Sequence, residues 1–91
     1  MNTNVQDFEA QLRAEGYTEI ETKSYDPRPA NGDHAHHFSV RGMVVDGAFT
    51  VTRDNKPVTY RPGETFAVAE GEIHFEEIGP EGARVLTGRK Y

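Results

Sequence analysis

Turn-forming residues recur every few positions after Gly16 and divide the chain into short segments rich in β-branched and aromatic residues. Segments of this kind between turns are typical of β-strands. Asp46-Gly47 predicts a two-residue hairpin, because both residues tolerate the positive φ that such a turn requires. Short strands at this spacing predict a sandwich or a small barrel. We expect strands over residues 17–25, 34–45, 48–53, 58–61, 65–68, 73–78 and 84–89.

The residues before Gly16 follow a different period. Val5, Phe8 and Leu12 are spaced as the apolar stripe of an amphipathic helix. Asn4 can cap its first turn, and Gly16 follows its last turn. The pattern predicts one short N-terminal helix that covers an end or an edge of the strands.

The length of 91 residues predicts a single domain over residues 1–91, with the helix at about 4–15 and the β-barrel at about 17–89. Only 35% of the residues are hydrophobic, so the core must be thin. A bound metal or a partner subunit would help to stabilise such a fold.

The charge and the missing cysteines exclude several classes of protein. A net charge of -5 without basic clusters argues against nucleic acid and anionic membranes as partners. The absence of cysteine excludes disulfides and thiolate metal sites. The run Met43-Val44-Val45 is far too short to cross a bilayer, and residues 1–7 show no signal peptide. We therefore expect a soluble, cytoplasmic protein.

All four histidines lie in two short segments, as His34, His36, His37 and His74. In a strand, His34 and His36 would share one face and His37 would point to the other. Two such imidazoles can bind one ion, and His74 would add a third if its strand ran alongside. Three neutral imidazoles suit zinc, iron, copper, nickel or cobalt. Ordinary exposed histidines are the alternative interpretation.

The glycine-rich frame around these histidines resembles the motifs of the cupin family. His34-Ala35-His36 and Gly47 resemble its first motif, which contains His-x-His. Gly63, Ala69-Glu70-Gly71 and His74 match the spacing of its second motif, with alanine in place of the motif proline. The resemblance covers nearly all of the predicted barrel.

The resemblance implies an all-β jelly-roll barrel that forms a homodimer through strand contacts. It implies a divalent transition metal (Zn, Fe, Ni, Mn, Co or Cu) bound by His34, His36 and His74, and a small-molecule ligand. Cupin chemistry includes dioxygenation, isomerisation and decarboxylation, so a metal-dependent enzyme of one of these types is one hypothesis. A non-enzymatic ligand-binding, sensor or accessory protein with a degenerate metal site is the alternative. A purely structural dimer is a third option.

The most serious departure from the family concerns its glutamate ligand, because this chain has Val40 or Arg41 at that position. Ile78 also replaces the motif asparagine. Glu76 has the same strand parity as His74 and is a candidate fourth ligand, general base or substrate-binding residue. Arg41 faces away from the histidines on simple parity, which predicts a surface or dimer-interface residue. A shifted register would bring Arg41 into the barrel, where it would bind an anionic ligand.

Overall fold

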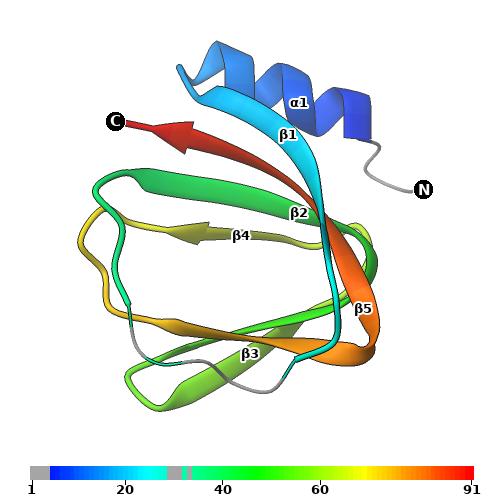
Figure 1. Cartoon of the computed structure of the whole chain (residues 1–91). Coiled ribbons are helices and arrows are strands. Elements are labelled where there is room, and N and C mark those ends of the chain that lie inside the picture. Colours follow the sequence, from blue (N-terminus) through cyan, green and yellow to red (C-terminus); the bar gives the residue numbers. More distant parts are fainter. Residues whose placement is uncertain (1–4, 29–31, 33) are drawn as a thin grey trace.

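The computed structural model describes residues 5–28, 32 and 34–91. Its elements are the helix α1 (Val5–Ala14) and the strands β1 (Thr18–Tyr25), β2 (Ser39–Arg53), β3 (Lys56–Tyr60), β4 (Thr65–Val68) and β5 (Phe75–Lys90). The predicted all-β barrel with one short helix is confirmed (Figure 1). The proposed N-cap, Asn4, lies outside the described residues. None of the described helical structure is long and apolar enough to cross a membrane.

The two long strands organise the antiparallel sheet, whose order is β1-β5-β2-β3 with β4 also paired to β2. β2 and β5 pair along most of their length, from Ser39 opposite Lys90 to Thr52 opposite Phe75. The first half of β2 pairs with β4, and its second half pairs with β3. Each long strand therefore belongs to both layers of the barrel, as Figure 1 shows.

The hairpin expected at Asp46-Gly47 is wrong, because β2 runs through these residues with irregular pairing on either side. The turn expected at residues 79–82 is also absent, since β5 is continuous there. Gly47 has a φ of 80°, and a Cβ atom on it would lie 2.0 Å from the carbonyl oxygen of Gly82. Positive φ serves a bulge as well as a turn, and here glycines let both long strands bend together.

The first histidine segment is less regular than the predicted strand over residues 34–45. β2 begins only at Ser39, and the described residues 34–38 belong to no strand, although His34 forms an isolated bridge with His74. The parity argument for His34 and His36 therefore rests on a wrong local conformation. The chain nevertheless brings His34 and His36 beside His74.

Two apolar clusters hold the layers together. Phe8 and Leu12 of α1 are 1% and 0% exposed and pack on Met43 and Leu86, which confirms the amphipathic stripe. The larger cluster lies between the layers and contains Val44, Phe49, Val51, Phe66, Val68, Ile78, Ala83 and Val85. Tyr25 and Tyr60 pack against this cluster and are partly buried.

Candidate metal centre

Backbone hydrogen bonds join the two histidine segments at one end of the barrel. The amide of His34 donates to the carbonyl of His74 at 2.8 Å, and the amide of His74 donates back at 2.9 Å. The amide of Gly71 donates to the carbonyl of His36 at 2.9 Å. These bonds hold the segments side by side, at the left of Figure 1.

The three predicted imidazoles converge. Ring centroids lie 4.3 Å apart for His34 and His74, and His36 lies 5.1 Å from each of them. One ligand atom from each of these histidines and one carboxylate oxygen of Glu76 all lie within 4.8 Å of one another. Donors around a tetrahedral zinc ion lie about 3.4 Å apart, so small side-chain movements would close this set on an ion. His37 is exposed and is not part of the cluster.

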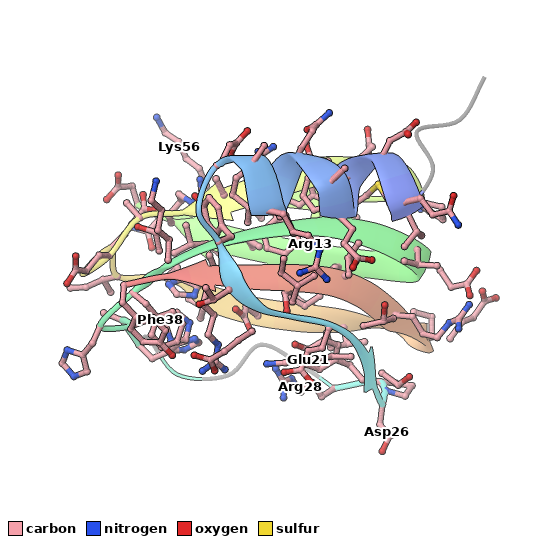
Figure 2. All side chains as sticks on the ribbon, turned by 90° about the horizontal axis from the view of Figure 1, so that it is seen from above. Arg13, Glu21, Asp26, Arg28, Phe38 and Lys56 are labelled. Atoms are coloured by element: carbon pink, nitrogen blue, oxygen red, sulfur yellow. The ribbon has the colours of Figure 1, made fainter. Side chains whose placement is uncertain are left out.

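Glu76 supplies the carboxylate of the cluster. Its Oε2 atom lies 3.3 Å from Nε2 of His74 and 3.9 Å from Nε2 of His34. Its Oε1 atom lies 3.5 Å from the guanidinium of Arg28, which Figure 2 labels. A nitrogen and oxygen donor set of this kind suits a divalent transition metal.

The imidazoles are oriented by the backbone. Nδ1 of His74 lies 3.0 Å from the carbonyl oxygen of Glu72, and Nδ1 of His34 lies 3.2 Å from that of Gly32. A carbonyl only accepts, so a proton on Nδ1 would satisfy each of these contacts and leave Nε2 with a lone pair for a metal ion. Metal-binding histidines are commonly held in this way. The residues therefore fit a metal ion, with His74 only 1% exposed.

The surroundings favour neutral forms of two side chains at the site. Burial lowers the pKa of His36, and the nearby His74 and His34 lower it further. Neutral imidazole is the form that binds metal. Burial also raises the pKa of Tyr25, and the negative charge of Glu76 adds to this effect. The Tyr25 phenol therefore stays protonated at neutral pH.

A cavity of about 100 Å³ opens beside His36 and Glu76 inside the barrel. Val40, one of the two positions where the family has its glutamate, lines this cavity. The ring of Phe38 also lines it and stacks on His36 with 4.9 Å between centroids. The site therefore offers a small space next to its donor atoms.

Arg41 lies apart from this cluster. Its Nη1 atom is 2.8 Å from Oε1 of Glu15, and its guanidinium lies 5.2 Å from the ring centroid of Phe8. Arg41 therefore packs against the helix and lies away from the histidines. The structure does not bring it to the cavity, so its position gives no support to a role in ligand binding.

Lys23 and Arg89 are cationic residues that line the cavity, and neither is predicted from the sequence as a site residue. The alternation of Val85, Thr87 and Arg89 on one face of the last strand would have indicated an inward-facing arginine. Such a residue is easily taken for part of a polar tail.

No protein-family model matches the sequence, and no curated protein matches it either. Solved structures do match. A cupin-2 domain protein from Shewanella frigidimarina has a TM-score of 0.66 at 14% identity, covering 79% of this chain and 69% of that one. The EutQ protein of Clostridium difficile has a TM-score of 0.67 at 15% identity, covering 87% of this chain and 60% of that one.

A conserved protein of unknown function from Streptococcus pyogenes also matches, with a TM-score of 0.67 at 20% identity over 78% of this chain. This chain spans 61% of that protein's length and 60% of EutQ, which is less than two thirds of either. At these identities the likeness shows the fold. The predicted cupin jelly-roll is thereby confirmed.

Proposed function

We propose that this chain binds one divalent transition metal ion through His34, His36 and His74, with Glu76 as the fourth ligand. The observation that carries the proposal is the convergence of the four donor atoms within 4.8 Å of one another in a cupin barrel. Zinc, iron, nickel, manganese, cobalt and copper all accept nitrogen and oxygen ligands of this kind.

Glu76 would compensate for the motif glutamate that this chain lacks. Val40 leaves an apolar side chain where the family has a carboxylate, whereas Glu76 presents one from β5 beside His74. A carboxylate partly neutralises a divalent ion and keeps it bound more firmly than three imidazoles alone. The side chain of Glu76 is 18% exposed, so solvent screens this charge only in part.

A metal with a free coordination position would polarise or activate a small molecule in the neighbouring cavity. The chain's own residues would then bind and orient that molecule. Tyr25, protonated at neutral pH, can donate a hydrogen bond from the cavity wall. A metal-dependent dioxygenase, isomerase or decarboxylase of a small organic molecule is the enzymatic form of this proposal.

The alternative is a ligand-binding, sensor or accessory protein without turnover. The missing motif glutamate favours this alternative. Apo and metal-loaded protein would be incubated with small carboxylates, phenols and keto acids, and products would be analysed by mass spectrometry. Product formation that requires the metal supports an enzyme. Binding without any product supports the alternative.

The metal site itself is tested by metal content. We expect about one ion per chain in the purified protein. His36→Ala should lose most of it, whereas His37→Ala should keep it, because His37 is exposed and outside the cluster. Equal metal content in the two variants would contradict the proposal.

A homodimer in the cytoplasm completes the proposal. β1 and β3 end the strand order, so among the described residues each has a free edge that a second copy can pair with. The absence of cysteine is compatible with a reducing compartment. Sedimentation at several concentrations would measure the oligomeric state.

A further inference from the structure

Two basic side chains face the cavity of a protein that is acidic overall. Lys23 of β1 and Arg89 of β5 line the same cavity as His36 and Glu76, although the chain carries a net charge of -5. Basic residues in an acidic protein are ordinarily distributed over the surface. Two of them at one small cavity concentrate positive charge there.

Strand register explains this placement. On β1, Lys23 and Tyr25 are half-buried whereas their neighbours Thr22 and Ser24 are exposed. On β5, Arg89 lies directly opposite Val40 of β2. The position where the family has a carboxylate thus holds an apolar side chain, and Arg89 has no acidic partner there.

Two of the residues that line the cavity are cationic, Lys23 and Arg89, and one is a carboxylate, Glu76. Glu19 and Glu21 also lie near Arg89. No ion pair joins Lys23 to a carboxylate within the described part of the chain. Arg89 contacts Glu19 at 3.5 Å, but the Glu19 side chain is 48% exposed and screened by water. Glu76 already contacts Arg28 and two histidines. A bound divalent cation would add further positive charge.

Arg89 lies close to the proposed metal ligands. Its guanidinium is 4.4 Å from the ring centroid of Phe38, whose ring stacks on His36. The phenol of Tyr25 adds a hydrogen-bond donor, since its pKa is raised by burial and by the nearby Glu76. Phe49 and Phe66 give the remaining wall an apolar character. An ammonium, a guanidinium and a phenol together form a donor set for a carboxylate.

We propose that the cavity binds a small organic carboxylate, with its anionic group on Lys23 and Arg89 and its other end toward the metal ligands. The binding of the anionic group by Lys23 and Arg89 does not depend on a metal ion. Only the orientation of the other end toward the metal ligands rests on the proposed function. The cavity volume of about 100 Å³ favours a small ligand. The ammonium and guanidinium groups in its wall disfavour an amine and favour a short organic acid.

The test compares propionate with its neutral counterpart propionamide by isothermal titration calorimetry on the full chain. We expect propionate to bind metal-loaded wild type at least about tenfold more tightly than propionamide. Lys23→Met and Arg89→Met should each weaken propionate binding about tenfold and leave propionamide binding unchanged. Equal binding of the two compounds to wild type, or no propionate binding, would overturn the inference.

Matched controls separate cavity charge from general charge. Lys56→Met and Arg84→Met remove exposed basic residues outside the cavity and should leave propionate binding unchanged. Figure 2 shows Lys56 on the side of the molecule away from Phe38. A loss as large as that in Lys23→Met would contradict a role for the cavity cations. Circular dichroism checks that each variant is folded, and the comparison on wild type needs no variant.

Metal content measured on the same samples distinguishes this inference from the proposed function. If the chain holds no metal but still prefers propionate, the metal site fails and the carboxylate site stands. If the metal binds but propionate and propionamide bind alike, the carboxylate site fails and the metal site stands. Apo protein should retain part of the preference, because the two cations belong to the chain.

Discussion

Nε2 of His74 lies 3.3 Å from Oε2 of Glu76, two residues further along the chain. The donor atoms of His34 and His36 complete the group. The carboxylate of this cluster therefore comes from the start of β5, whereas the family motif would place it on β2 at Val40 or Arg41. The chain keeps a mixed histidine and carboxylate donor set although the motif position has changed.

Glu76→Gln should weaken metal binding about 10- to 100-fold, because it removes a charged ligand and leaves an amide of the same size. Competition with a chromophoric chelator measures the change. Glu77→Gln is the control, since Glu77 is the exposed neighbour on the same strand and lies outside the cluster. Similar affinities for the two variants would exclude Glu76 as a ligand.

Gly47→Ala should destabilise the fold by more than about 3 kcal/mol or prevent folding, because it combines unfavourable backbone geometry with a buried clash. The new Cβ would lie 2.0 Å from the carbonyl oxygen of Gly82. Gly63→Ala is the control, with a φ of 89° and no atom within 4 Å. It should cost only about 1–2 kcal/mol in urea unfolding. If Gly47→Ala and Gly63→Ala lowered the free energy of unfolding equally, the close approach of Gly47 to Gly82 would not matter for stability.

The stability of the metal-free protein should fall as the pH falls below about 6.5, the value for unperturbed histidine. The pKa of His36 is lowered in the folded state, chiefly by burial. The unfolded chain therefore binds more protons than the folded chain once the pH drops below that value. Stability is present above this range and is lost as the pH falls toward the folded-state pKa.

Urea unfolding of His36→Gln at several pH values measures this contribution. Between about pH 6.5 and the lowered pKa of His36, the stability of this variant should fall less steeply with falling pH than that of wild type. The exposed His37 provides the matched variant, His37→Gln, whose slope should stay close to wild type. Metal affinity should weaken over the same range, since protons compete for the imidazoles. A metal affinity that is constant down to about pH 4 would contradict histidine ligation.

Arg41→Met should leave metal and propionate binding unchanged and lower stability by about 0.5–1 kcal/mol. Arg41 contacts Glu15 and Phe8 near the helix, where Glu15 is 48% exposed and its charge is screened. Calorimetry and urea unfolding on the same variant give both readouts. Loss of propionate binding would instead assign Arg41 to the ligand site.

The sequence indicates the fold class well, because strand composition and the helical stripe of Phe8 and Leu12 are local properties. It also identifies the histidines, since His-x-His and the spacing around His74 are short-range patterns. The continuity of β2 through Asp46-Gly47 is not predictable in this way. The same two residues suit a hairpin or a bulge, and the choice depends on pairing with residues of β5 far along the chain.

Some site residues can likewise be predicted from local sequence patterns, whereas others come together only through strand pairing. Glu76 is found from its parity with His74, two positions away. Lys23 and Arg89 belong to neighbouring strands that meet only in the folded barrel, so their joint charge at one cavity follows from register. The first histidine segment illustrates the opposite case. It reaches the predicted arrangement from a conformation that is not a regular strand, because backbone hydrogen bonds to the His74 segment position it.

The long strands couple the two ends of the barrel. β2 and β5 each run through both layers, so neither layer can open without breaking pairs in the other. The two histidine segments lie at one end of the barrel, and the bends of β2 and β5 lie at the other (Figure 1). Both ends therefore belong to one cooperative unfolding unit. A ligand that stabilises the histidine end would also slow amide hydrogen exchange around the distant glycine bends.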